Sequence, residues 1–173
     1  IENPLLVSMQ ALAITVPQTL WVIDLLCRLV AGVEITGVTN YMLDSSIPLF
    51  FRGLSLFHGW LPFFLLWLPP LLGYDRRALG LQTVAAIVIL LVSYIFGPAP
   101  PPSASHPSWA VNINYVYGID DKQPQTFVAP WLWVLLLMAV NVIAFYLPSH
   151  CVFRRVFRSA GGHSLADNVS RAR

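Results

Sequence analysis

The sequence contains few charged residues for its length. Of 173 residues, 10 are lysine or arginine and 8 are aspartate or glutamate, so 10% are charged, against roughly 25% in a soluble domain. Hydrophobic residues make up 57% of the chain, and the mean hydropathy is +0.67. This balance excludes an ordinary soluble globular domain. The small net charge of +2, with no basic stripe, also argues against nucleic acid as a partner.

The common chemical signatures are absent as well. The two cysteines, Cys27 and Cys151, lie in apolar contexts without CxxC or Cys/His ligand spacing, so no metal site is predicted and the cofactors are unknown. The chain has no GxSxG, HExxH, P-loop or GxGxxG motif, and no internal repeat of solenoid length. An enzymatic function would therefore rest on residue types alone.

Four apolar stretches take up most of the chain, and each approaches the roughly 20 residues that cross a bilayer. They run from about residue 5 to 30, 48 to 72, 78 to 96 and 127 to 147. The first contains Gln10, Gln18 and Asp24 and lacks a basic leader, so it is not a cleavable signal peptide. These stretches predict an all-α, multi-pass helical transmembrane bundle. Because the chain opens with Ile1, already in an apolar run, we expect further spans upstream.

The arginines predict how the bundle is oriented. Arg76 and Arg77 lie between the second and third stretches, and five more arginines follow the fourth, whereas loops 31–47 and 97–126 are mainly acidic. Positively charged loops stay in the cytoplasm. We therefore expect loop 73–77 and a basic tail, residues 154–173, inside a bacterial cytoplasmic membrane. Both longer loops are expected outside.

Prolines and aromatic residues mark the irregular segments. Pro62, Pro69 and Pro70 predict a kink in the second span. Residues 1–153 are expected to form one transmembrane domain that carries an outer loop, 97–126. That loop begins as a proline-rich stretch and continues as WAVNINYVYG, an alternating pattern typical of a short strand or an interfacial segment.

Polar residues within the spans fall between the midplane and the outer face. They are Asp24 and Arg28 in the first span, Arg52 and His58 in the second, and Tyr94 in the third. The outer loops add polar residues on the same side: Glu34, Thr36, Thr39, Asn40, Asp44, Asn112, Asn114, Tyr115 and Tyr117. The sequence therefore predicts a polar pocket that opens outward.

His58 is the intramembrane residue with the most chemical options. It either forms a hydrogen bond to a neighbouring helix and so stabilises helix packing, or it acts as a general base or cofactor ligand. A bis-histidine site would need a second histidine within a span, and His106, His150 and His163 lie in a loop or near the tail. Ligation of a pigment by His58 alone stays open.

The other candidates also have a structural and a functional interpretation. Asp24 and Arg28, four residues apart, either neutralise one another or belong to a site, with Asp24 as a candidate catalytic residue. Arg28 and Arg52 are candidates to hold an anionic lipid phosphate. Alternatively, Arg52 extends to the headgroups at the surface. Asn112, Asn114 and Tyr115 either bind a polar headgroup or form an interfacial anchor.

Several segments resemble a group of uncharacterised bacterial multi-pass membrane proteins. They are IPLFFRGLSLFHGWLPFFLLWL with LGYDRRALGLQT, NINYVYG with PQT, and YLPSHCVFRRVF. In that group the spans continue upstream, and the resemblance implies no function. A very faint similarity, carried by a histidine within a span, is to the transmembrane protein 164 family, which is associated with acyl transfer on lipids. Neither cysteine falls in an equivalent motif.

Two hypotheses follow. The first is a non-catalytic integral membrane protein, a scaffold or accessory subunit that packs against other membrane subunits and holds a lipid or pigment. The second is an outer-face lipid hydrolase or acyltransferase with His58 as base, Asp24 as orienting carboxylate, Arg52 at the headgroup and a Thr or Ser nucleophile. A transporter is a weaker third alternative, because the four stretches show no inverted repeat.

Overall fold

The computed structural model describes residues 3–120 and 122–157, and it contains four helices long and apolar enough to cross a membrane. They are α1 (Pro4–Ala31); α2 (Leu49–Leu54) with α3 (Phe57–Leu72); α4 (Ala78–Phe96); and α5 (Pro130–Val140), which continues through the π-helical segment Asn141–Tyr146 (η4) into α6 (Leu147–Val156). No strand occurs among the described residues. The prediction of an all-α transmembrane bundle is confirmed.

Both ends of α1 are capped by residues suited to those positions. The Asn3 side-chain oxygen accepts hydrogen bonds from the N–H groups of Leu5 and Leu6, at 3.1 and 3.2 Å. Gly32 ends the helix with a φ of +67°, and its N–H bonds the carbonyl of Arg28 at 3.1 Å. Glycine adopts this left-handed conformation without the steric cost of a Cβ. The chain therefore turns sharply into loop 32–48.

The second span is interrupted, although not at a proline. α2 and α3 are separated at Ser55 and Leu56, where the N–H of His58 bonds the carbonyl of Ser55 at 3.1 Å in a tightened turn. α3 then continues through all three prolines. Pro62 has no N–H to donate to the carbonyl of His58, four residues earlier, which loosens the helix at this turn. The break therefore places His58 at the beginning of α3.

The last span is longer than the sequence predicted. Helical structure begins at Pro130 and continues to Val156, nine residues past the expected end at 147. The hydropathy of this final stretch is low because it contains Ser149, His150, Arg154 and Arg155. These residues nevertheless lie in α6. Helix therefore includes the start of the predicted tail, and residues 158–173 lie outside the described residues.

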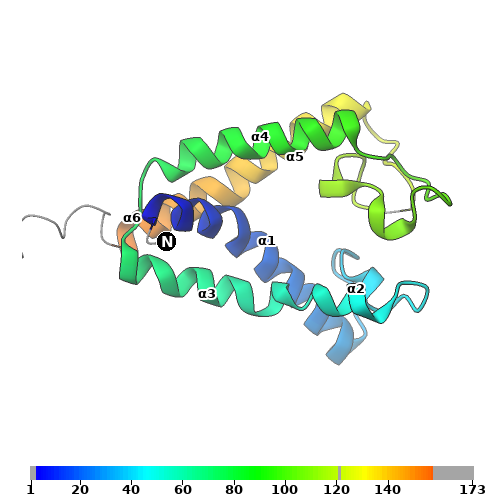
Figure 1. Cartoon of the computed structure of the whole chain (residues 1–173), viewed down its shortest axis with the longest axis horizontal. Coiled ribbons are helices and arrows are strands. Elements are labelled where there is room, and N and C mark those ends of the chain that lie inside the picture. The colour runs from blue at the N-terminus through cyan, green and yellow to red at the C-terminus, as the bar shows by residue number, and fades with distance from the viewer. Residues whose placement is uncertain (1–2, 121, 158–173) are drawn as a thin grey trace, which may run out of the picture.

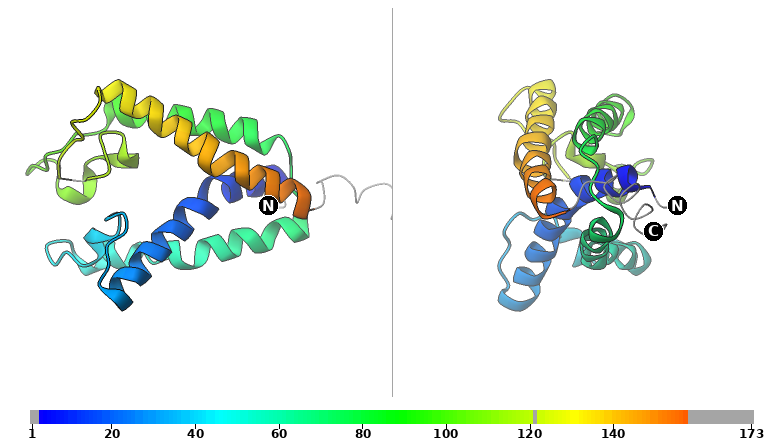
Figure 2. Two further views of the ribbon diagram at one scale, coloured as in Figure 1. Left: turned by 180° about the vertical axis from the view of Figure 1, so that it is seen from behind. Right: turned by 90° about the vertical axis from the view of Figure 1, so that its left-hand side faces the viewer.

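The helices diverge from one end of the bundle to the other (Figures 1 and 2). α1 is the central element, which packs against α3, α4, η4 and α6. We call the end with the start of α1, the end of α6 and turn 73–77 the termini end. The opposite end, with loops 32–48 and 97–129, is the loop end. Both long loops therefore meet at the same end, as four alternating spans require.

At the termini end the helices share one core. It contains Ala11 and Leu12 of α1, Leu65 of α3, Ala78 of α4, Phe153 of α6, and Tyr74 from the turn. The Tyr74 hydroxyl lies 2.8 Å from Nδ1 of His150, within hydrogen-bond distance, and burial raises the pKa of Tyr74, so the hydroxyl stays protonated at neutral pH. Small alanines allow helices to approach closely in a membrane.

Large apolar side chains cover the outside of the bundle. On α3, Trp60, Phe63 and Trp67 are 59 to 70% exposed, and similar residues point outward from the other spans. Such a surface needs lipid or partner helices around it. Together with the length of the four helices, it identifies an integral, multi-pass membrane protein.

The left-handed turn after α1 provides a test of the fold. We expect Gly32→Ala to lower the free energy of unfolding by about 1 kcal/mol, because an alanine is strained at this φ. Gly80→Ala is the matched control, since Gly80 is helical and an added Cβ there meets nothing within 4 Å. Denaturant titration in detergent micelles measures both, and equal stabilities would contradict the prediction.

Candidate functional site

A large cavity lies at the loop end, between the two long loops. This loop-end pocket has a volume of about 850 Å³. Its first wall comes from α1, loop 32–48 and the start of the second span: Arg28, Glu34, Thr36, Gly37, Asn40, Tyr41, Leu43, Asp44, Ile47, Phe51 and Ser55. Its second wall comes from the longer loop: Ser108, Trp109, Val111, Asn112, Asn114, Tyr115, Ile119, Asp120 and Lys122. Two distant segments of the chain therefore form one polar cavity.

Asp24 holds the first wall in place. Its carboxylate, 2% exposed, accepts hydrogen bonds from the N–H groups of Ile35 at 3.2 Å, Thr36 at 2.8 Å and Thr39 at 3.3 Å. The Thr39 hydroxyl donates a fourth bond at 2.6 Å. Three of these donors are backbone groups, and a charge buried near a membrane needs such compensation. The negative charge of Asp24 therefore folds loop 32–48 back onto α1.

Arg28 forms its ion pair with Glu34 and not with Asp24. Its guanidinium lies 2.8 Å from the Glu34 carboxylate and also donates to the side-chain oxygen of Asn40. The Asn40 amide and the Arg28 guanidinium hold the pKa of Glu34 below its ordinary value, so Glu34 is ionised at neutral pH. The expected mutual neutralisation of Asp24 and Arg28 is therefore wrong, because each bonds a different part of the loop.

Asp44 and Arg52 complete the hydrogen bonding of the first wall and its loop. The hydroxyl and N–H of Ser46 donate to Asp44 and lower the pKa of its carboxyl group. Arg52 donates to the carbonyl of Met42 at 3.2 Å, and it does not line the pocket. Arg52 therefore stabilises loop 32–48 from outside the pocket.

Asn112 organises the second wall. Its side-chain nitrogen donates to the carbonyls of Gly118 and Asp120, both at 2.9 Å, and its oxygen accepts from the N–H of Tyr117 at 2.9 Å. The residue is 3% exposed and has a φ of +50°, which asparagine adopts more readily than most residues. Asn112 therefore acts as an internal brace, and little of it faces the pocket.

The same segment is not a strand. Asn114 and Tyr115 also have positive φ angles, +59° and +60°, and they belong to the short helical turn η3 (Ile113–Tyr115). Asn114 bonds Ser93 of α4 at 2.8 Å, and the Trp133 ring N–H of α5 donates to the Tyr115 carbonyl at 2.8 Å. Of the two interpretations of the alternating pattern, the strand is wrong, because these side chains fold the segment back onto two helices.

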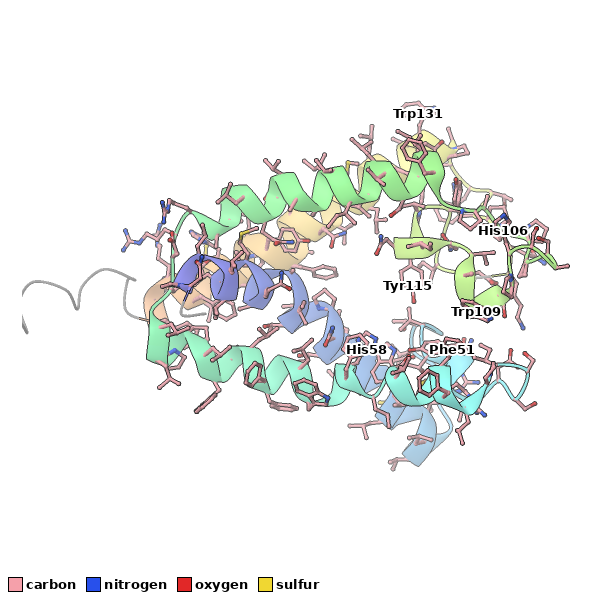
Figure 3. All side chains as sticks on the ribbon, viewed as in Figure 1. Phe51, His58, His106, Trp109, Tyr115 and Trp131 are labelled. Carbon is pink, nitrogen blue, oxygen red and sulfur yellow. The ribbon has the colours of Figure 1, made fainter. Side chains whose placement is uncertain are left out.

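Two contacts join the walls across the pocket. The rings of Phe51 and Trp109 stack with centroids 5.0 Å apart and an angle of 12° between planes, and Figure 3 shows them at the loop end. The Lys122 ammonium lies 4.0 Å from the Asp44 carboxylate. Both contacts involve exposed side chains, so they link the loops loosely.

A second cavity of about 400 Å³ lies deeper in the bundle. This interhelical cleft is formed by α1, α4, η3 and the last span: Ala13, Pro17, Gln82, Ala86, Ile89, Leu90, Asn114, Tyr115, Leu137, Asn141, Phe145 and Tyr146. Asn114 and Tyr115 line both cavities. The polar pocket therefore borders a largely apolar cleft within the spans.

His58 lies outside both linings. Its ring packs between Trp21 and Phe57, with centroids 4.6 and 4.1 Å away, on the α1 and α3 side of the bundle (Figure 3). Its Nδ1 and the Trp21 ring nitrogen are buried without a hydrogen-bond partner among the described residues. The carboxylate of Asp24 is turned to the loop, so the hypothesised pairing with His58 is not formed.

The structure thus separates the predicted site residues into two groups. Arg28, Asn112, Asn114 and Tyr115 line the pocket, whereas Asp24, Arg52 and His58 do not. Their roles as ligand-binding or catalytic residues stay predictions. Cys27 and Cys151 are free thiols. Within residues 3–120 and 122–157, no group of three His, Cys, Asp or Glu side chains could hold a metal ion. His163 lies outside the described residues.

Sequence reasoning missed several lining residues. Phe51 and Trp109 were not singled out, because exposed aromatics are common near membrane surfaces. Asp120 and Lys122 lie in loop 97–126, whose mainly acidic composition predicted the orientation of the bundle and no binding site. Gln82 and Asn141, which line the cleft, could have been found, since amides within apolar spans are uncommon and need partners.

The chain matches no protein-family model, no curated protein and no solved structure. The resemblances noted in the sequence therefore stay predictions, and any function must be argued from the two cavities.

The bonds of Asp24 generate a stability test. We expect Asp24→Asn to lower the free energy of unfolding by roughly 2–3 kcal/mol, because its amide nitrogen would face backbone N–H groups that need an acceptor. Glu34→Gln, at an exposed ion pair, should leave stability nearly unchanged. Denaturant titration in micelles compares them, and a small effect of Asp24→Asn would show that the loop does not depend on this carboxylate.

Proposed function

We propose that this chain is a non-catalytic integral membrane protein that holds a lipid by its polar headgroup in the loop-end pocket. The observation that carries the proposal is a polar cavity of about 850 Å³ at the ends of four membrane spans. A cavity of this size suits a small-molecule ligand. Its position, where spans meet the membrane surface, is the level at which lipid headgroups lie.

The charges of the pocket favour a zwitterionic headgroup. Its lining has three carboxylates, Glu34, Asp44 and Asp120, and two cations, Arg28 and Lys122. Arg28 is already bonded to Glu34 and Asn40, so it has less to offer an anionic phosphate than the sequence suggested. Aromatic rings, including Phe51 and Trp109, also line the cavity, and such rings attract ammonium groups.

A non-catalytic role fits the placement of the candidate catalytic groups. Asp24 is fully engaged by the loop, and His58 packs between aromatic rings away from the pocket lining. The exposed aromatic face of α3 suits contact with further membrane subunits, which supports a role as scaffold or accessory subunit. A pigment at His58 is the alternative occupant within this same class of function.

The proposal includes the orientation predicted from the sequence. Arg76 and Arg77 lie at the termini end, and the acidic loops lie at the loop end. In a bacterial cytoplasmic membrane this charge distribution places the termini end inside and the pocket on the outer face. The lipid would then come from the outer leaflet.

The first experiment is purification of the protein from its native membrane in mild detergent. Native mass spectrometry should detect one retained lipid, and Ser108→Trp, which fills the pocket, should release it. Ala104→Trp is the matched control, because Ala104 is exposed in the same loop and does not line the pocket. The proposal fails if Ser108→Trp retains the lipid fully. It also fails if the protein turns over lipid and His58→Ala abolishes that turnover.

The charge argument makes a separate prediction. In nanodiscs we expect tighter binding of phosphatidylcholine than of phosphatidylglycerol, and Asp120→Lys should reverse this order by making cations outnumber carboxylates in the lining. A shift in relative affinity of about tenfold corresponds to 1.4 kcal/mol. An unchanged preference would show that the headgroup is not selected by charge.

A further inference from the structure

The interhelical cleft differs in character from the pocket beside it. Its volume is about 400 Å³, and most of its lining is apolar, with Ala13, Ala86 and Leu90 among the contributors. Ala13 and Ala86 leave space because their side chains are small. Apart from Asn114 and Tyr115 of η3, the lining residues belong to membrane spans, so most of the cleft lies at the level of the hydrocarbon layer.

The polar groups of the cleft have partners within the protein. The Asn141 amide donates to the Leu137 carbonyl at 2.8 Å, and the Asn114 amide donates to the Ser93 hydroxyl at 2.8 Å. Asn141 and Tyr146 begin and end the π-helical segment, a type of irregularity frequent at functional sites. Because these groups are already bonded, the cleft offers mainly apolar surface to an occupant.

The cleft also continues from the pocket. Asn114 and Tyr115 of η3 line both cavities, so a polar chamber at the loop end is followed directly by an apolar one within the spans. From Leu90 to Gln82 the cleft follows eight residues of α4, which is about 12 Å of helix. This length is close to the depth of one leaflet, about 15 Å, or half of the hydrocarbon layer.

We propose that the interhelical cleft is the seat of one hydrocarbon chain of the lipid, with η3 at the junction between headgroup and chain. This inference rests on the function proposed above and adds a second, separate binding site to it. The order of the two cavities matches the order of parts in an amphipathic lipid. Ile89, 52% exposed, stands in the lining, so the cleft borders the surrounding bilayer, from which a chain enters sideways.

The test separates chain binding from headgroup binding. The probes are octanoyl, lauroyl and palmitoyl lysophosphatidylcholine, together with glycerophosphocholine, which has the headgroup and no chain. For the wild type, affinity should increase with chain length. For Ala86→Phe, which fills the cleft, palmitoyl lysophosphatidylcholine should bind about tenfold more weakly while glycerophosphocholine binds as before.

Val88→Phe is the matched control. Val88 lies on α4 two residues from Ala86, is 52% exposed and does not line the cleft, so its substitution should leave every affinity unchanged. Ala13→Phe fills the cleft from the opposite wall and should reproduce the effect of Ala86→Phe. Unchanged binding of glycerophosphocholine by each variant shows that its loop end is still folded.

The outcomes distinguish the two proposals. If the wild type binds all chain lengths equally, or if both cleft-filling variants bind the palmitoyl lipid like the wild type, the chain does not occupy the cleft. In either case headgroup binding in the pocket would stand. If the wild type binds none of the four probes, the proposed function fails together with this inference.

Discussion

The architecture of the loop end depends on the buried carboxylate of Asp24. This group lies near the end of a membrane span, where an uncompensated charge is costly, and its four hydrogen bonds come from the loop that follows. Loop 32–48 supplies the hydrogen-bond donors. Because these bonds hold the loop against α1, they also place Glu34 and Asn40 within reach of Arg28. One wall of the pocket is therefore a consequence of satisfying a single charge.

The opposite wall is held by hydrogen bonds of neutral side chains, whereas the first wall is held by the ionised carboxylate of Asp24. Asn112 satisfies two carbonyls and one N–H of its own loop, and Trp133 and Ser93 fasten that loop to α5 and α4. Both loops are thus held mainly by the helices from which they emerge. The helices themselves converge only toward the termini end, where α1, α3, α4 and α6 share a core with the turn residue Tyr74.

Much of the fold could be predicted because it follows from composition. Runs of some 20 apolar residues indicate spans wherever they occur, and the arginines and acidic loops alternate consistently along the chain. The end of the last span was misplaced, since His150 and Arg154 resemble a surface segment although they lie in α6. A kink in the second span was predicted from its prolines, but the interruption lies at Ser55 and Leu56, before all three of them, and the prolines remain inside α3.

The candidate site was less predictable, because residue types do not determine the rotation of helices about their axes. Asp24 and Arg28 have the spacing of an ion pair, yet loop donors compete for one and Glu34 for the other. The sequence WAVNINYVYG alternates like a strand, yet its asparagines adopt positive φ angles. The cleft depends on η4 and on the small residues Ala13 of α1 and Ala86 of α4, whose proximity no local pattern encodes.

The divergence of the helices has a thermodynamic consequence. Near the loop end, Phe51 with Trp109 and Asp44 with Lys122 link the walls through exposed side chains, so the bundle is held together there less firmly than at its core. An occupant that touches both walls adds its own binding free energy to that weak connection. By linkage, such an occupant raises the free energy of unfolding by RT ln(1 + [L]/Kd), where [L] is its free concentration and Kd its dissociation constant. With the proposed lipid as that occupant, the stability of the protein would depend on the composition of the membrane as well as on the chain.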